Sequence, residues 1–217
     1  MADNVAMLIA LALVMLSYLL GSLSGSLLLG KLRGVDIRAS GSGNAGGTNA
    51  LRTQGVWFAL GTVAIDIGKG ALAAWIGTRF TPTGMSAIWP WACAFAATLG
   101  HVWPVFHGFR GGKGAATLVG GLAVLWPQCL PVTFLVWALA LVLAGYVGLA
   151  TMLAGISLIP QALLAGDDGV RLGYAVLCAL FLVFTHRVNI ARLRAGTESR
   201  FERVRVLARW LERRTRS

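Results

Sequence analysis

The sequence is short of charge, and above all of acidic charge. Of its 217 residues only 12% are charged, against roughly 25% in a soluble domain, and only 8 are Asp or Glu. Several stretches of about 20 residues therefore lack charge almost completely, which is the length that a transmembrane helix needs. Because backbone polar groups in lipid must be satisfied within the chain, the sequence predicts an all-α polytopic membrane protein and excludes an ordinary soluble domain.

Cysteine is scarce and unpaired in the sequence. The three cysteines, Cys93, Cys129 and Cys178, stand apart in apolar stretches and form no C-x-x-C pair. This pattern indicates neither a zinc site nor a disulfide framework, and we expect no metal and no cofactor. The first apolar stretch follows Asp3 without a preceding Lys or Arg and runs to about Leu29. It is too long for a cleavable signal, so we expect a retained helix.

Basic residues are placed unevenly. The formal net charge is +11, and ten of the 19 Lys and Arg residues lie at or after Arg187, with most others in short loops. Such clustering is typical of the positive-inside pattern, in which the acidic partner is a membrane surface and not a nucleic acid.

The same charges predict the topology. Apolar segments cover about residues 4–30, 56–77, 86–106 and 172–185, and residues 115–166 contain no charge. The basic loop 33–52 and the basic tail share one side only if 115–166 makes three passes, with turns at Trp126-Pro127 and at 145–148. The prediction is seven transmembrane helices, with the N-terminus outside and the C-terminus cytoplasmic. Arg79 and Arg171 then lie outside, and Lys69 lies within the membrane.

The chain divides into a membrane domain, residues 1–198, and a tail, residues 199–217. In the tail, apolar residues recur at helical spacing with Arg on the other faces: Phe201, Val204, Leu207, Ala208 and Leu211. This pattern predicts a basic amphipathic helix on the inner leaflet, the alternative being a solvated tail.

Two glycine-rich segments follow apolar stretches. The first glycine segment (residues 41–52, GSGNAGGTNALR) combines glycines with hydroxyl and amide side chains and one Arg, which together suit phosphate oxygens. Its candidate phosphate-binding residues are Ser42, Gly43, Asn44, Thr48, Asn49 and Arg52. The segment contains G-x-G-x-x-G, but it joins two membrane helices and not a strand to a helix, so we reject a dinucleotide site.

The second glycine segment (residues 100–117, GHVWPVFHGFRGGKGAAT) repeats this chemistry. Arg110 and Lys113, set among Gly108, Gly111, Gly112 and Gly114, form a second candidate anion cradle. The GGKG run fails the P-loop pattern because His107 occupies the position of the first glycine, so ATP hydrolysis is unsupported. The alternative for both segments is that glycine only shapes tight turns.

A third motif (residues 186–198) closes the last apolar segment and contains His186, Asn189 and Glu198. His186 and Asn189 are three residues apart and share a face on a continuing helix. Histidine there is either structural or takes part in the chemistry. Asp66 and Lys69 are also three residues apart, within an apolar segment, and we expect a structural ion pair that supports the site.

These motifs, in this order, resemble the bacterial acyl-phosphate:glycerol-3-phosphate acyltransferase family (the PlsY type). The resemblance rests on GSGNAGGTNALRTQG, on the step from Asp66 to Gly70, on GHVWPVFHGFRGGKGAAT and on HRVNIARLRAGTE. The sequence departs from the family at Gly47, where Ala is usual, and at Val188, where an acid is common. Gly148 and Ala150 stand where serines are frequent. We therefore carry over neither a serine from that helix nor an acid at position 188, between His186 and Asn189.

The resemblance implies a seven-helix enzyme of the bacterial inner membrane with a cytoplasmic active site. It would move an acyl group from acyl phosphate to the sn-1 hydroxyl of glycerol 3-phosphate and so begin phospholipid synthesis. Its products would be lysophosphatidic acid and phosphate. His186, Asn189, Lys113 and Ser42 are the expected catalytic residues. The base is either His186 or a phosphate oxygen of the substrate, in which case His186 only donates a hydrogen bond.

Two other functions fit part of the sequence. A transporter of a phosphorylated anion would explain the intramembrane Asp66 and Lys69, but no inverted repeat is visible. A lipid-binding scaffold would not need Asn, Thr and His side chains in three motifs.

Overall fold

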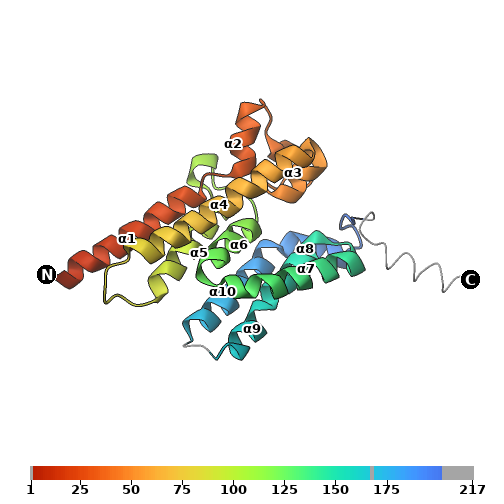
Figure 1. Ribbon diagram of the computed structural model, residues 1–217. Helices are drawn as coiled ribbons and strands as arrows, with labels where there is room; N and C mark the ends of the chain where they lie inside the picture. The colour runs from red at the N-terminus through yellow and green to blue at the C-terminus, as the bar shows by residue number, and fades with distance from the viewer. Residues whose placement is uncertain (1, 167–168, 202–217) are drawn as a thin grey trace, which may run out of the picture. The chain divides into compact units, whose positions relative to one another are not determined.

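The computed structural model describes residues 2–166 and 169–201, and within these ranges the chain consists of helices and turns without a strand (Figure 1). It divides into two compact units, Met1–Pro127 and Gln128–Ser217. The first unit contains α1 (Ala2–Gly21), α2 (Gly25–Leu32), the 3₁₀ turn η1 (Ile37–Ala39), α3 (Gly47–Gln54), α4 (Val56–Phe80), α5 (Ile88–Val102), η2 (Val105–His107) and α6 (Ala115–Leu125).

Glycine allows the long helices of the first unit to pack at close range. A β-carbon at Gly70 of α4 would lie 2.0 Å from the Thr117 carbonyl oxygen of α6. In the same way, a β-carbon at Gly21 of α1 would lie 2.0 Å from the Ala97 carbonyl oxygen of α5. Small residues at such contacts let helix backbones approach in a membrane, where apolar burial provides little drive for helix association. These contacts join α4 to α6 and α1 to α5, and α4 also packs against α1 and α5.

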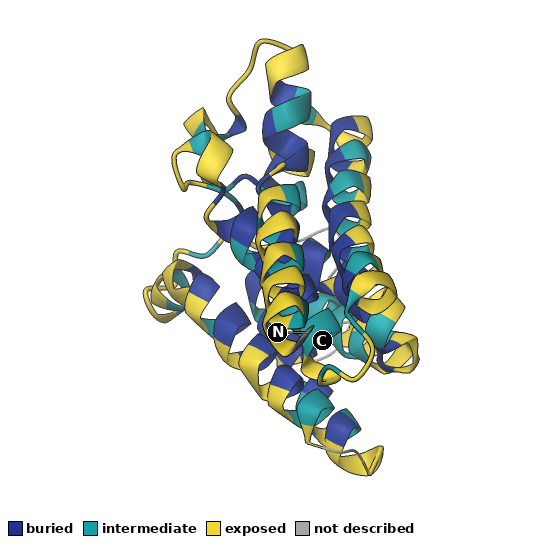
Figure 2. Cartoon of the chain, turned by 90° about the vertical axis from the view of Figure 1, so that its left-hand side faces the viewer, coloured by how far each residue is buried: buried dark blue, intermediate teal, exposed yellow. Residues whose placement is uncertain are grey.

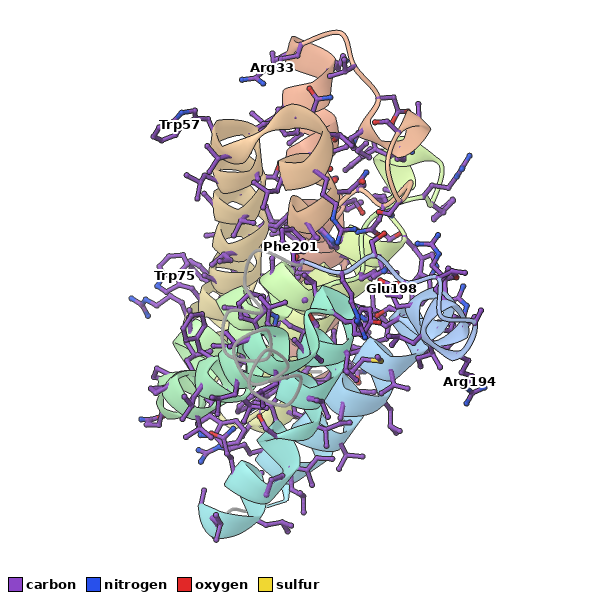
Figure 3. All side chains as sticks on the ribbon, turned by 90° about the vertical axis from the view of Figure 1, so that its right-hand side faces the viewer. Arg33, Trp57, Trp75, Arg194, Glu198 and Phe201 are labelled. Carbon is purple, nitrogen blue, oxygen red and sulfur yellow. The ribbon has the colours of Figure 1, made fainter. Side chains whose placement is uncertain are left out.

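Helix α4 has the length and the aromatic positions of a complete membrane span. It contains 25 residues, and its Trp57 and Trp75 are 80% and 50% exposed. Their spacing in the sequence corresponds to about five helical turns, or ~27 Å, so the two rings share one face. Figure 3 shows both side chains on the same side of the helix. Because Trp favours the two membrane interfaces and the hydrocarbon core is about 30 Å thick, this face is suited to lipid.

The first apolar segment, predicted over about residues 4–30, is broken in the structure. Helix α1 ends at Gly21 and α2 begins at Gly25. The break leaves backbone groups without helical partners, and an ion pair of α4 satisfies two of them. Lys69 Nζ donates to the Leu23 carbonyl oxygen at 3.0 Å, and the Gly25 amide donates to Asp66 Oδ1 at 3.1 Å. Within a membrane, backbone that leaves a helix needs such partners from the protein or from a water-filled cavity.

The second unit contains α7 (Leu130–Ala144), α8 (Val147–Ile156), α9 (Leu158–Leu164), α10 (Val170–Thr185) and α11 (Arg187–Arg194). The breaks between α6 and α7 and between α7 and α8 fall where the sequence predicts turns, at Trp126-Pro127 and within 145–148. Beyond α11 the chain returns to the turn between α7 and α8. The Phe201 amide donates to the Gly145 carbonyl oxygen at 2.8 Å, and Arg200 Nε donates to the Tyr146 hydroxyl at 2.5 Å.

Within residues 2–166 and 169–201, four helical stretches are long and apolar enough to cross a membrane: Asp3–Gly21, Val56–Phe80, Pro127–Ala144 and Val147–Leu164. The pair α10 and α11, bent by 56°, makes a fifth if it counts as one span. Figure 2 shows exposed residues along the outer faces of the helices, and many of these side chains are large and apolar, such as Leu8, Phe134 and Leu180. The amphipathic helix predicted for the tail falls almost entirely in 202–217, outside the described residues.

Candidate functional site

The first glycine segment lies on a small apolar core. Six buried residues from α2, η1, α3, α4 and the segment itself pack together: Leu27, Ile37, Ala45, Ala50, Phe58 and Ala59. Ile37, Ala45 and Ala50 are completely buried. The core therefore holds the start of α3 against α2 and α4, while Ser42 and Arg52 of the segment stay exposed.

Asn49 organises this segment from inside. Its side chain is 1% exposed. Asn49 Oδ1 accepts a hydrogen bond from the Ser42 amide at 2.9 Å, and its Nδ2 donates to the Ile37 and Ser40 carbonyl oxygens, both at 3.0 Å. Both amide protons of Asn49 are thus committed to the protein. The side chain shapes the segment, and a contribution to phosphate binding would be indirect.

The other polar residues of the first glycine segment lie just before α3 or along it. Helix α3 begins after Gly46, and Thr48 lies half-buried in its first turn. Ser42 and Gly43 are exposed, Asn44 is half-buried, and Arg52 is exposed in the last turn of the helix. Gly43 has φ +72°, a left-handed conformation that favours glycine. Amides at the start of a helix and the helix dipole both favour an anion at this end.

In the second glycine segment, two of the expected phosphate-binding amides already have partners. The Gly111 amide donates to the Val102 carbonyl oxygen at 3.2 Å, and the Gly112 amide donates to the His101 carbonyl oxygen at 3.1 Å. These bonds satisfy the end of α5, where Pro104 cannot continue the helix. Amides for an anion are therefore expected further along the chain, beyond Gly114, which has φ +91° and precedes α6.

Lys113 lies just before that helix start. It is half-buried, and Arg110 is exposed. Helix α6 begins at Ala115 without a side-chain cap, so its first amides and the Lys113 ammonium together provide donors and positive charge. In both glycine segments the glycines lead into a helix N-terminus, but the cation lies just before that helix in the second segment and in the last turn of the helix in the first.

The two segments also touch each other within the first unit, through a residue that the motifs did not predict. The Ala45 amide donates to the Gly111 carbonyl oxygen at 3.4 Å. Arg38 Nη1 donates to the carbonyl oxygens of His107 and Arg110, at 3.0 and 3.1 Å. Arg38 therefore clamps the backbone of the second segment to the chain just before the first. Its only sequence signal is an acid two residues earlier, Asp36.

Asp36 holds the Arg38 fork in place. Arg38 Nε and Nη2 donate to the two carboxylate oxygens, with the shortest contact at 2.8 Å. The side-chain hydrogen bond from Arg38 lowers the pKa of Asp36 to about 2, and the same bond raises the pKa of Arg38. Burial, together with the charge of Arg38, lowers the pKa of His107. His107 is therefore neutral at pH 7 and adds no cation to the site.

Asp66 and Lys69 form the expected ion pair, with Lys69 Nζ 2.9 Å from Asp66 Oδ1. Both side chains are buried, and a third residue joins them: His101 Nδ1 lies 2.9 Å from Lys69 Nζ. The pair supports the break between α1 and α2, as described above. Through His101 it also reaches the second glycine segment, a link that the sequence spacing could not indicate.

The third motif lies in the second unit, at the bend between α10 and α11. His186 is 4% exposed and forms the junction of the two helices. Its Nδ1 lies 2.8 Å from the Leu182 carbonyl oxygen. Because a carbonyl can only accept, Nδ1 carries a proton, and a neutral ring presents a lone pair at Nε2. In this tautomer Nε2 of a neutral ring is an acceptor, so a hydrogen bond donated by His186 to substrate, as predicted, would require the doubly protonated ring.

Asn189 and Glu198 are held together by the returning chain. Asn189 Nδ2 donates to Glu198 Oε1 at 2.7 Å, the length of a charge-assisted bond. Asn189 is buried, and Gly148 of α8 packs against it so closely that a β-carbon there would lie 2.9 Å from Asn189 Nδ2. Figure 3 shows Glu198 and Phe201 on the segment that follows α11. Glu198 thus positions the Asn189 amide.

Comparison with known proteins gives matches over most of the chain. The glycerol-3-phosphate acyltransferase family matches residues 11–196. Glycerol-3-phosphate acyltransferase of Symbiobacterium thermophilum is 41% identical over 190 residues, which cover 87% of this chain and 93% of that protein. The enzyme of Aquifex aeolicus is 38% identical over 195 residues, covering 88% and 99%.

A solved structure has the same fold. The glycerol 3-phosphate form of PlsY (YgiH), an integral membrane glycerol 3-phosphate acyltransferase, superposes with a TM-score of 0.83 at 37% identity. The match covers 91% of this chain and 98% of that one. The lysophosphatidic acid form of the same protein gives a TM-score of 0.82. This chain therefore belongs to the glycerol-3-phosphate acyltransferase family.

Proposed function

We propose that this protein transfers a fatty acyl group from acyl phosphate to the sn-1 hydroxyl of glycerol 3-phosphate. The hydroxyl oxygen forms a bond to the acyl carbon, the bond from that carbon to the phosphate oxygen breaks, and the hydroxyl proton leaves with the phosphate. The products are lysophosphatidic acid and inorganic phosphate. The donor is a mixed anhydride and already activated, so the reaction needs no covalent enzyme intermediate and no cofactor.

The observation that carries this proposal is the pair of glycine segments in a chain of this family. Each leads into a helix N-terminus and carries a cation: Lys113 lies just before the start of α6, and Arg52 lies in the last turn of α3. Two such anion sites suit a reaction in which both substrates carry phosphate. Lys113 and Arg52 are proposed to stabilise the phosphate that gains charge as the acyl bond breaks.

The remaining predicted residues are given roles that match their contacts. Ser42, at the exposed start of the first segment, is proposed to hydrogen-bond a phosphate oxygen. His186 is proposed to accept a hydrogen bond from the attacking hydroxyl in the bound substrate, before its proton passes to the phosphate, and Asn189, fixed by Glu198, to orient the same group. Arg110 is exposed and is proposed to attract the anionic substrates.

We further propose seven membrane passes with the N-terminus outside, and with the glycine segments, the third motif and the C-terminus on the cytoplasmic side of the inner membrane. The placement of Lys and Arg supports this topology. Residues 1–198 are proposed to form the membrane-embedded enzyme and 199–217 a basic segment that lies on the lipid surface.

The test is an acyl-transfer assay with the purified protein. Acyl phosphate and glycerol 3-phosphate should yield lysophosphatidate, whereas acyl-CoA or acyl carrier protein as donor should not. Comparable rates with acyl-CoA would refute the donor assignment. Protein reconstituted in liposomes and given labelled glycerol 3-phosphate without donor tests the transporter alternative, for which uptake should stay at the level of empty liposomes.

A further inference from the structure

A buried imidazole at the start of the second glycine segment lies against Gly112 further along the same segment. His101, in the last turn of α5, is 2% exposed. Its carbonyl oxygen accepts the Gly112 amide at 3.1 Å. Its ring reaches the same residue, because a β-carbon at Gly112 would lie 2.0 Å from His101 Nε2 and 2.8 Å from Cε1. The Ala45 carbonyl oxygen lies 3.0 Å from that point. The two glycine segments and the ring therefore meet at Gly112.

The surroundings of the ring fix its protonation. Lys69 Nζ has three neighbouring acceptors, Leu23 O at 3.0 Å and Asp66 Oδ1 and His101 Nδ1 at 2.9 Å. An ammonium has three protons and no lone pair, so Lys69 donates to each of them. His101 Nδ1 is then an acceptor, and the proton of the ring is on Nε2.

This assignment leaves the buried cluster with no net charge, which burial favours. It contains one ammonium, one carboxylate and a neutral imidazole. His101 Nδ1 and Asp66 Oδ1, 3.3 Å apart, are then two acceptors bridged by the Lys69 ammonium and not an ion pair of their own.

We propose that His101 is a positioning residue for the second glycine segment. Lys69 and Asp66 hold the imidazole from α4, and the Nε2–H edge of the ring fixes the backbone at Gly112, and through it Lys113 and the start of α6. The effect on turnover rests on the proposed function, because the position of Lys113 matters for rate only if this segment holds a phosphate. The contact at Gly112 itself does not depend on that function.

A compensation experiment tests the contact. The methyl group of Gly112→Ala would clash with the His101 ring. We expect roughly a hundredfold loss of kcat/KM, the effect of a catalytic group displaced by about 1 Å. His101→Asn keeps an acceptor near Nδ1 for Lys69 but removes the atoms at the ε position. The double variant of His101→Asn with Gly112→Ala should therefore regain at least about tenfold over Gly112→Ala alone, a non-additivity typical of residues in contact.

Gly111 provides the matched control. A β-carbon there would meet the His101 carbonyl oxygen at 2.0 Å and Pro104 Cδ at 2.7 Å, atoms that His101→Asn leaves in place. Gly111→Ala should be at least as damaging as Gly112→Ala, and His101→Asn should not improve it. Equal recovery of both alanine variants, or recovery of neither, would overturn the proposal.

Two further measurements cover the cases in which an alanine variant does not fold or the wild type does not turn over. His101→Gln places an amide near the ε position and should retain more activity than His101→Asn; equal activity of the two would count against positioning by the ring edge. The unfolding temperatures of the wild type, His101→Asn, Gly112→Ala and the double variant measure the same compensation without substrate. If the wild type is inactive but the unfolding temperatures show compensation, the proposed function is refuted and the contact at Gly112 stands. If the wild type is active but no compensation is seen, the positioning role of His101 is refuted.

Discussion

Replacing His186 separates two ways in which the attacking hydroxyl can lose its proton. The Nδ1 proton of His186 is used by the Leu182 carbonyl oxygen at 2.8 Å. If the ring is the base, Nε2 takes the proton in the transition state. If a phosphate oxygen of the substrate is the base, Nε2 takes no proton and only accepts a hydrogen bond that orients the hydroxyl in the bound substrate, before the proton passes to the phosphate. We favour the second mechanism, because Val188 occupies the position where an acid could orient the imidazole.

Two substitutions divide the functions of the ring. His186→Gln keeps an acceptor near the position of Nε2 but loses the donor to Leu182. His186→Asn can keep that donor but has no acceptor at the ε position. With substrate phosphate as base, His186→Gln loses about one net hydrogen bond, roughly 0.5–1.5 kcal/mol, or about a two- to tenfold drop in kcat. Loss of a general base would instead cost roughly 10²–10⁴.

The assay follows release of phosphate from acyl phosphate at saturating glycerol 3-phosphate, from acid to neutral pH, for the wild type and both variants. Under the favoured mechanism, wild type and His186→Gln share the same pH limb and differ only in height. A folded His186→Gln protein that still binds glycerol 3-phosphate but loses a hundredfold or more, together with the wild-type limb, would refute this reasoning. Unfolding temperatures of the three proteins provide the control for folding.

Three other predictions concern the first unit. Lys113→Ala should lower kcat by about 10²–10³, the typical loss when one preorganised charge is removed, with an unchanged unfolding temperature; a drop below tenfold in the transfer assay would contradict its role. Asn49→Ala should destabilise the protein by about 2–4 kcal/mol, because it removes three hydrogen bonds at once: the one from the Ser42 amide and one of those to each of the Ile37 and Ser40 carbonyl oxygens. Denaturant unfolding measures this, and Thr53→Ala is the control on the same helix. The ion pair of Asp36 and Arg38 should lose its stabilising effect on the fold only at acidic pH. Because the pKa of Asp36 falls from 3.8 to about 2 on folding, its stabilisation is complete above pH 3.8 and disappears as the pH falls through 2. The difference in unfolding temperature between wild type and Asp36→Asn should therefore be constant from pH 7 to about 5 and shrink below it, and a difference that disappears by pH 5 would contradict this assignment.

The sequence determined the class of protein and the chemistry of its motifs. Long stretches without charge indicate segments that lie in lipid. There a single segment satisfies its own backbone N–H and C=O groups only as a helix, the other solution being a closed barrel of strands. Glycines beside Arg52 and Lys113 predicted two anion sites, and both residues lie at or near a helix that starts after the glycines. These features are local in the chain, so composition and spacing carry them.

Tertiary structure decided which polar groups remain for substrate. The amides of Gly111 and Gly112 are bonded to the end of α5, and the protons of Asn49 are bonded to its own segment. Glycine spacing could not reveal this, because a hydrogen-bond partner depends on where the preceding helix ends. Arg38 and His101 were missed for the same reason: their partners lie far along the chain.

The break between α1 and α2 shows most clearly what the sequence alone could not predict. The apolar run continues through Ser22 and Ser24 as one segment, and the Asp66 and Lys69 spacing indicates only that the two can pair on a helix. The fold brings α4 beside the break, where the pair satisfies Leu23 and Gly25 and holds His101. A buried ion pair is stable only where its hydrogen-bonding groups all have partners. Here the groups come from α2, α4, α5 and the break between α1 and α2, and only the folded chain brings these together.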